Sequence, residues 1–400
     1  MPATTLTICG KKSHKRLQWF ASQLLLYIYF LFLTPQKSRL MKKLLILPLF
    51  LLLYCVSFSQ ELAYKNGADE WDADSLGNYR VLVNFDGTGN IAKVHIPWRR
   101  RDDNPSSKKI IVQDAQTQQV IMNATAKKIT GAGGDVYFEP ASGKGTYYIY
   151  YMPYKNEGRT NYPRGVYLAA VETASSEWLN AIDYDAVPNA TAKEIQAINA
   201  FSSNYPMEVT ATRAETEALL KKNSTKPFLV FPEQREYPVR MRNRLPYRWI
   251  QSGPSYSFTG DAARGEYYSF QLALFAIQQL KDVSISFTEL RSSSGKIIAA
   301  KNISCLNNTG VKYDATAFSQ NVHVPSGEVQ SLWCLLQIPE TTAKGNYKGK
   351  AIIHSNGNAD VQVQISINVS DQLLTDGGIN TRGRKPACIG LIQLWRRKTK

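Results

Sequence analysis

Tyr347-Lys-Gly-Lys-Ala-Ile-Ile-His354 leads through Ser355-Asn-Gly-Asn358 into Val361-Gln-Val-Gln-Ile-Ser-Ile-Asn-Val369. An Asn-Gly dipeptide between two alternating runs is the strongest short-range signal for a β-hairpin, because both residues accept the positive φ angles of a tight turn. Alternate residues of a strand lie on the same face of the sheet. The second run therefore predicts one apolar face, formed by Val361, Val363, Ile365, Ile367 and Val369.

Strand patterns also precede this hairpin. Residues 265–274, 283–288 and 330–338 are rich in β-forming residues, and the last run stops at Pro339. We predict an immunoglobulin-like β-sandwich over residues 228–370. Tyr347 stands where the tyrosine corner of such sandwiches bonds back to the upstream backbone, with a surface tyrosine lacking this bond as the alternative.

The preceding part of the chain, residues 60–225, has the same character until it nears its end. Five strand-like runs are separated by turn clusters such as Gly131-Ala-Gly-Gly134, and this spacing is typical of a sandwich. Residues 191–201 and 212–222 instead carry Ala, Glu, Leu and Lys at helical spacing after a Thr. The sequence therefore predicts a mainly β protein with two sandwich-like domains and a short helical segment between them. The five runs are residues 79–85, 91–96, 109–112, 135–138 and 146–152.

The net charge of +16 is concentrated at the two ends of the chain. Residues 1–59 hold eight Lys or Arg and residues 380–400 hold seven, with no acidic residue in either segment. The body has 33 basic residues against 32 acidic ones. A nearly neutral body gives no reason to propose a nucleic-acid partner.

The run that starts at Met41-Lys-Lys has the basic, apolar and small-residue regions of a secretory signal peptide over residues 41–59. Cleavage is expected between Ser59 and Gln60, which predicts export to the periplasm, the cell surface or the medium. A membrane anchor is the alternative, although the apolar run is short for a span. Any membrane contact would then involve only the leader. Residues 1–40 are either an extra leader or a wrongly assigned extension upstream of Met41.

Only two of the five cysteines, Cys305 and Cys334, lie in the body of the chain. Buried free thiols are the favoured interpretation, and one disulfide in an oxidising compartment is the alternative.

No pattern in the sequence indicates catalysis, a cofactor or a metal. His95, His323 and His354 are isolated in strand-like segments, so we assign no catalytic, cofactor-binding or metal-ligating residue. Asp69-Glu70 is an adjacent acidic pair close to the expected mature terminus, where order is poor. Asp102-Asp103 follows three arginines and is expected to neutralise them.

The most unusual patch is Trp98-Arg-Arg-Arg-Asp102 at the end of a predicted strand. Trp98, Arg99, Arg100, Arg101 and Asp102 could contact a glycan or an anionic group. They could instead fasten this domain to another through charge-assisted hydrogen bonds, which is the interpretation we favour.

Five stretches of the sequence recur in order and at a consistent spacing in one known family. They are Tyr79-Arg-Val-Leu-Val-Asn-Phe85, His95-Ile-Pro-Trp-Arg-Arg-Arg-Asp102, Arg264-Gly-Glu-Tyr-Tyr-Ser-Phe-Gln271, Gln330-Ser-Leu-Trp333 and Gly345-Asn-Tyr-Lys-Gly349. Together they resemble the N-terminal region of secreted bacterial glycoside hydrolases of family 123, over about residues 75–379. The resemblance implies β-sandwich domains ahead of a (β/α)8-type catalytic barrel. It also implies hydrolysis of β-linked N-acetylgalactosamine through an acidic pair that assists the substrate's own acetamido group.

The chain departs from this family after Asp376-Gly-Gly-Ile-Asn380, where a basic tail replaces the expected barrel. A barrel takes about 250 residues, and 20 remain after residue 380. We therefore expect residues 371–400 to be truncated or out of frame, and no family catalytic residue carries over. The leading hypothesis is an inactive, non-catalytic front portion of a glycan-degrading hydrolase whose partner is the missing barrel. The alternative is a stand-alone module that binds amino-sugar glycans or adheres to surfaces through Trp98, Trp249 or Tyr147.

Overall fold

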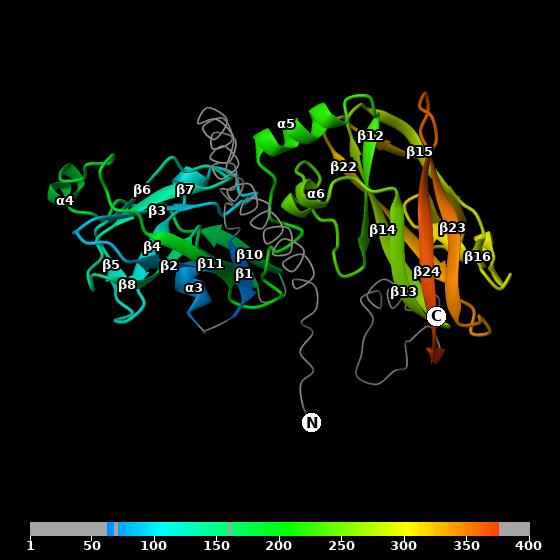
Figure 1. Cartoon of the computed structure of the whole chain (residues 1–400), viewed down its shortest axis with the longest axis horizontal. Coiled ribbons are helices and arrows are strands. Elements are labelled where there is room, and N and C mark those ends of the chain that lie inside the picture. Colours follow the sequence, from blue (N-terminus) through cyan, green and yellow to red (C-terminus); the bar gives the residue numbers. More distant parts are fainter. Residues whose placement is uncertain (1–61, 68–70, 160–161, 376–400) are drawn as a thin grey trace, which may run out of the picture. The chain divides into compact units, whose positions relative to one another are not determined.

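The computed structural model describes residues 62–67, 71–159 and 162–375. Within them the protein is mainly β, with several sheets, which confirms the predicted fold class (Figure 1). The described residues include four α-helices: α3 (Ala73–Leu76), α4 (Ser176–Asn180), α5 (Arg213–Lys222) and α6 (Tyr247–Ser252).

The first sandwich combines a six-stranded sheet with a three-stranded sheet. Strand β2 follows the predicted run closely, and its inward positions Val81, Val83 and Phe85 are fully buried. They share one hydrophobic core with residues of the smaller sheet, such as Val94 and Phe138. The larger sheet has the order β1 (Ala63–Asn66), β11 (Thr191–Ala197), β2 (Tyr79–Phe85), β8 (Gly145–Tyr151), β4 (Ile110–Asp114) and β5 (Val120–Ile121); the smaller has the order β3 (Ala92–Ile96), β7 (Gly134–Phe138) and β6 (Ala124–Lys127).

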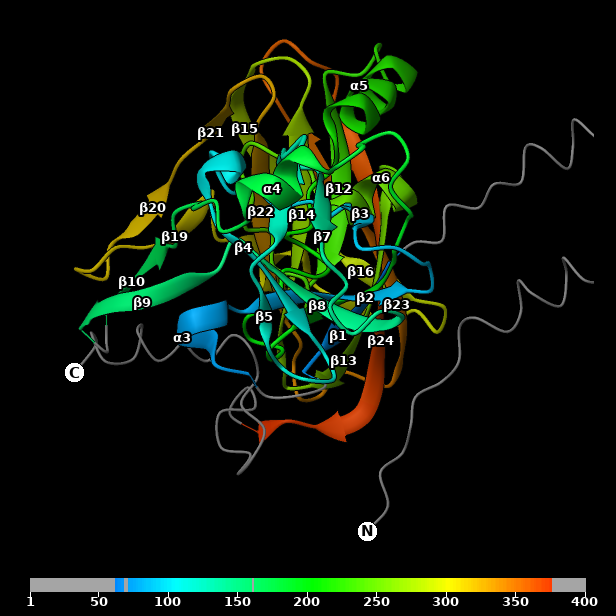
Figure 2. The same cartoon turned by 90° about the vertical axis from the view of Figure 1, so that its left-hand side faces the viewer.

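Two further features complete this part of the chain. Strands β9 (Tyr154–Arg159) and β10 (Tyr162–Tyr167) form an antiparallel ribbon of their own, which is seen as a pair of long strands in Figure 2. A 3-10 turn at Pro105–Ser107 leads into β4.

Strand β11 corrects the sequence analysis, which predicted a helix over residues 191–201. It pairs in parallel with β1 and antiparallel with β2. Its Ile195 and Ala197 lie in the core, and Arg80 donates from Nε to Gln196 Oε1 at 2.7 Å. Helix propensity is a weak preference that tertiary context overrides, and here pairing on both sides together with burial favours the strand.

The second sandwich packs a four-stranded sheet against a larger sheet around one core. Its strands follow the predicted runs with small shifts of their ends. Cys305 and Cys334 are both buried and free, as favoured from the sequence. One sheet has the order β12 (Phe228–Gln234), β14 (Tyr267–Ala276), β22 (Val329–Gln337) and β18 (Ile303–Cys305); the other has the order β13 (Ser257–Arg264), β24 (Val361–Leu373), β23 (Gly345–His354), β15 (Leu280–Phe287) and β21 (Val322–Val324), with β16 (Leu290–Ser292) and β17 (Ile297–Ile298) beside β23.

The predicted Asn-Gly hairpin is confirmed. Strands β23 and β24 pair antiparallel from Ile353 opposite Val361 to Gly345 opposite Val369. Val363, Ile365, Ile367 and Val369 are buried and Val361 packs against the same core, so the alternation does set the inward face. Gly357 has a φ of 79°, in the region that a turn glycine adopts at no steric cost. A second, shorter hairpin in this domain joins β19 (Thr309–Val311) to β20 (Ala317–Ser319), after a 3-10 turn at Ala300–Asn302.

Helix α5 confirms the second predicted helix. Thr212 accepts from the Glu215 backbone N–H, and Glu215 accepts from the Thr212 N–H, which is a complete capping box. Leu219 of α5 packs with Trp249 of α6 and with Leu229 and Phe231 of β12. The labelled elements α5, α6 and β12 can be followed in Figure 1. Because Phe228 and Val230 point into the sandwich core, β12 is buried on both faces. The helix that was assigned to the end of the first domain therefore packs on a sheet of the second.

Both sandwiches contain the same tyrosine contact. The Tyr347 hydroxyl donates to the Ala343 carbonyl at 2.7 Å, and the Tyr147 hydroxyl donates to the Gly143 carbonyl at 2.7 Å. Each tyrosine is buried and follows a Lys-Gly pair, Lys144-Gly145 and Lys344-Gly345. The bond predicted at Tyr347 is present, while the immunoglobulin type of the second sandwich stays a prediction.

Replacing Tyr347 or Tyr147 by Phe is expected to lower the free energy of unfolding by about 1 kcal/mol each, because a hydrogen bond is lost while the buried ring is kept. Urea denaturation of the full chain measures the change. Tyr313→Phe is the matched control, since this side chain is 85% exposed and should leave stability unchanged. Equal effects at all three positions would contradict the assigned role of the two hydroxyl groups.

Candidate functional site

The candidate site is the segment Trp98–Asp103, between β3 and the 3-10 turn. Its backbone is held by the predicted turn cluster, since the N–H groups of Arg99 and Arg100 donate to the carbonyls of Ala132 and Gly131 at 3.0 and 2.7 Å. A Cβ on Gly134 would lie 2.6 Å from the Trp98 ring. Glycine at this position therefore makes room for the indole.

Trp98 belongs to the core of the first sandwich. It is 2% exposed, stacks on Tyr151 and donates from Nε1 to the Thr130 carbonyl at 2.8 Å. Trp249 and Tyr147 are buried as well. The three aromatic side chains considered for sugar stacking therefore present no ring to solvent, which contradicts that route to glycan binding.

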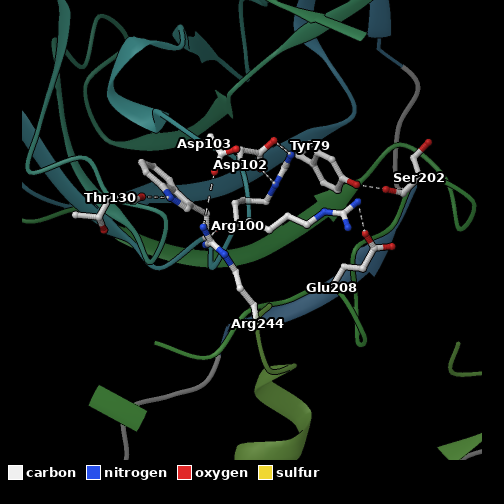
Figure 3. Close-up of polar contacts among 10 residues, drawn as sticks. Tyr79, Arg100, Asp102, Asp103, Thr130, Ser202, Glu208 and Arg244 are labelled. Carbon is white, nitrogen blue, oxygen red and sulfur yellow. Dashed lines mark hydrogen bonds and ion pairs between the residues drawn. The ribbon is translucent and has the colours of Figure 1, made fainter. Parts of the chain in front are cut away.

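Arg100 is buried and forms a bidentate pair with Asp102, with Nε and Nη2 at 2.7 and 3.1 Å from the two carboxylate oxygens (Figure 3). Its guanidinium lies 4.4 Å from the centre of the Tyr79 ring. Burial raises the pKa of Tyr79 to about 12, so the phenol stays neutral and donates to the Ser202 carbonyl. Asp102 thus neutralises an arginine, as expected, whereas the Asp103 side chain is 93% exposed.

Arg99 reaches the first turn of α5. Its Nη1 and Nη2 lie 2.8 and 2.9 Å from the two oxygens of Glu215, and its guanidinium lies 3.8 Å from the centre of the Tyr247 ring. The Thr210 N–H donates to the Arg99 carbonyl at 3.0 Å. Burial by itself raises the pKa of Glu215, but the hydrogen bonds donated by Arg99 and by the Thr212 N–H outweigh it and hold the pKa below its ordinary value of 4.5.

Two more arginines extend these contacts. Glu208 accepts from Arg101 at 2.8 Å and from Arg240 at 3.0 Å. Arg244 donates to the Arg100 carbonyl at 3.4 Å and lies 4.0 Å from the Asp103 carboxylate (Figure 3). We call the whole set the arginine junction, and its members are Arg99, Arg100, Arg101, Asp102, Asp103, Glu208, Glu215, Arg240, Arg244 and Tyr247.

The junction residues beyond Asp103 were missed by sequence reasoning. They lie more than 100 positions further along the chain, and nothing local marks them as partners of the three arginines. The sequence marked Thr212 as the start of a helix, but it singled out neither Glu215 as the other half of a capping box nor the pairing of Glu215 with Arg99. The predicted cleavage pair Ser59 and Gln60 and the acidic pair Asp69 and Glu70 lie outside the described residues.

The three body histidines, which appeared isolated, each lie beside an aspartate. His95 Nδ1 is 2.7 Å from Asp135, and His323 Nε2 is 3.9 Å from Asp282. His354 bridges Asp360 and Ser286, with Nδ1 and Nε2 at 2.9 Å from the respective oxygens. A Ser-His-Asp chain can move a proton, but Asp360 and Ser286 are exposed, so solvent screens this chain. In the described part of the molecule, no group of three or more His, Cys, Asp or Glu could hold a metal ion, and no helix is long and apolar enough to cross a membrane.

The bidentate pair of Arg99 and Glu215 is expected to contribute a coupling of about 1 kcal/mol to stability, because it is ordered, partly buried and backed by Tyr247. A double-mutant cycle of Arg99→Ala and Glu215→Ala measures it and cancels the loss of the helix cap. The coupling should vanish as the pH falls through the lowered pKa of Glu215, since protonation removes its charge.

The control cycle uses Arg213 and Glu217 on the same helix, which are 2.7 Å apart with side chains 92% and 61% exposed. Solvent should make this second coupling clearly smaller. Equal coupling energies in the two cycles would refute the prediction that the Arg99–Glu215 pair stabilises the protein more than an exposed ion pair does.

Comparison with known proteins finds a family model that matches part of this chain. Residues 69–198 match the family model described as glycoside hydrolase 123, N-terminal domain. A family 123 glycoside hydrolase from Clostridium perfringens, studied for glycolipid glycan hydrolysis, is 14% identical, with 37% of this chain and 28% of that chain covered and a TM-score of 0.28. The chain therefore spans 28% of the length of that structure. The comparison with curated proteins finds no match.

Two other solved structures are similar to parts of the chain. PapD-like domain 7 of human CEP192 is 15% identical, with 30% of this chain and 83% of that chain covered and a TM-score of 0.21. The other is self-complemented MyfA in complex with galactose, the major subunit of Myf fimbriae from Yersinia enterocolitica. It is 10% identical, with 35% of this chain and 98% of that chain covered and a TM-score of 0.21. The family model therefore identifies residues 69–198 as a region like the N-terminal domain of glycoside hydrolase 123.

Proposed function

We propose that the described residues are the non-catalytic N-terminal part of an exported, glycan-degrading glycoside hydrolase. The match of residues 69–198 to the N-terminal domain of family 123 carries this proposal. The likeness to family 123 also suggests the substrate class of the complete enzyme, which is a glycan with β-linked N-acetylgalactosamine. The partner of this region is a catalytic barrel domain in the complete enzyme.

Within this function, the arginine junction fastens the first sandwich to the segment that leads into the second. Each of its first three arginines already faces a carboxylate: Glu215, Asp102 and Glu208. The charge of each guanidinium is thus already balanced by a carboxylate, although Arg100 Nη1 is buried without a hydrogen-bond partner among the described residues and the Arg101 side chain is 50% exposed. Trp98 is in the core, so the segment also lacks an aromatic platform for a sugar ring. The contacts support a fastening role over glycan contact.

A non-catalytic role predicts that the purified full chain will not hydrolyse a chromogenic β-N-acetylgalactosaminide above the buffer rate. An active family 123 enzyme assayed in parallel shows that the substrate is competent. Titration of the chain with amino-sugar glycans should give no saturable binding. Turnover would refute the non-catalytic role, and saturable binding without turnover would favour a stand-alone glycan-binding module.

Export predicts that the chain expressed from Met41 in a bacterial host loses residues 41–59 and begins at Gln60. Cell fractionation and the intact mass of the mature protein measure this, because cleavage removes a defined segment. A chain that starts with Met directly before Gln60 should stay in the cytoplasm as the matched control. Recovery of the uncleaved chain from the cytoplasm would contradict export.

A further inference from the structure

Cys305 and Cys334 face each other across two neighbouring strands. Cys305 ends the edge strand β18, and Cys334 lies directly opposite in β22. Both belong to the core of the second sandwich and are 3% and 0% exposed. Between them the chain forms the β19–β20 hairpin and strand β21 before it returns as β22.

The type of strand pair matters for the chemistry. The Leu306 N–H donates to the Trp333 carbonyl at 2.8 Å, and this pair stands one position beyond Cys305 and Cys334 in the same register. Hydrogen-bonded and non-hydrogen-bonded pairs alternate along an antiparallel ladder, so the two cysteines occupy a non-hydrogen-bonded pair. Cα atoms at such a pair are about 4.5 Å apart, which falls inside the range that a disulfide spans.

The two thiols also interact directly. The neighbouring Cys334 side chain lowers the pKa of Cys305, whereas burial raises the pKa of Cys334 well above its ordinary value. The Cys305 thiol donates to Asn307 Oδ1 at 3.8 Å, and the Cys334 thiol donates to the Leu332 carbonyl at 3.7 Å. The reactive species in disulfide chemistry is the thiolate. Cys305 is therefore the thiol that attacks first, with Cys334 held against it.

Cys305 also borders a cavity of about 210 Å³, whose other walls include Ser286, Phe287, Ile303 and Asn308. Cys334 is not among the residues that line this cavity, so Cys305 is the cysteine of the pair that stands nearer to a reagent entering it. Cys334 is enclosed by its neighbours in the core, so it reacts only through Cys305.

We propose that Cys305 and Cys334 are a covalent modification site, at which the two thiols close to a cross-strand disulfide in the presence of a small disulfide oxidant such as oxidised glutathione. The Cys305 thiolate attacks one sulfur of oxidised glutathione and releases one glutathione thiolate. The Cys334 thiolate then attacks the Cys305 sulfur of the mixed disulfide and releases the second glutathione. The protein loses two protons and two electrons, and the oxidant becomes two molecules of glutathione.

The bond secures an edge strand. Strand β18 is paired on one side only, with β22, so its backbone is held by a single ladder. A disulfide at its last residue closes the loop of residues 306–333 and restricts the unfolded chain. The expected consequence is a more stable second sandwich, independent of any activity of the complete enzyme.

The test uses the purified full chain in two arms of the same glutathione buffer, one incubating the native protein and one refolding it from denaturant. Trypsin cleavage after Lys301, Lys312 and Lys344 places Cys305 and Cys334 in separate, adjacent peptides. A disulfide therefore yields a linked pair two hydrogen atoms lighter than the sum of the two peptides, and reduction separates it. Mass spectrometry distinguishes this pair from links to Cys9, Cys55 or Cys388.

The linked pair is expected in both arms, and its appearance only after refolding would still establish the site. Absence of the linked pair from both arms would overturn the proposal, as would glutathione retained on Cys305 with Cys334 free. The linked protein should melt about 5–10 °C above the reduced protein. The double variant Cys305→Ala/Cys334→Ala is the matched control, and its melting temperature should not respond to the buffer. An oxidised wild-type chain that melts no higher than the reduced one would contradict the stabilising effect.

Discussion

A guanidinium that is removed from water must find its counter-charge within the protein, and this requirement organises the arginine junction. Arg100 is buried against Tyr79, and the two oxygens of Asp102 accept from its Nε and Nη2, while its Nη1 is buried without a partner in the described part of the chain. Removing one partner of a buried ion pair costs about 3–5 kcal/mol, because the other charge is left uncompensated. The loop after β3 can therefore take few conformations. The conformation of this loop places Arg99 beside Glu215 and Arg101 beside Glu208.

The junction also ties a local helix signal to a distant loop. Glu215 closes the capping box of α5 and receives Arg99 at the same time. Helix α5 in turn packs through Leu219 on the outer face of β12. One carboxylate thus connects the start of a helix, a loop of the first sandwich and a sheet of the second. These connections support the fastening role that we propose for the arginine junction.

The two sandwiches share one tyrosine contact, although their strand orders differ. Each buries a tyrosine that donates to a carbonyl four residues upstream, and in each a Lys-Gly pair and one further residue precede the tyrosine. In each, strand pairing decided a point that the sequence did not. The helix predicted over residues 191–201 is wrong, because residues 191–197 form a strand between two others. Cys305 and Cys334 are 29 positions apart but become direct neighbours through the register of β18 and β22.

The sequence by itself determined the elements whose signals are local. The period of two in residues 361–369, the Asn-Gly turn and the Thr212 cap are carried by neighbouring residues, and all three are present in the structure. It also identified Trp98–Asp102 as unusual, since three arginines in a row need explanation. Only the tertiary structure decided which carboxylates face those arginines, that Trp98 is core and that residues 191–197 form a strand. Each of these depends on contacts between residues far apart in the chain, whose energies outweigh local preference and leave no periodic trace in the sequence.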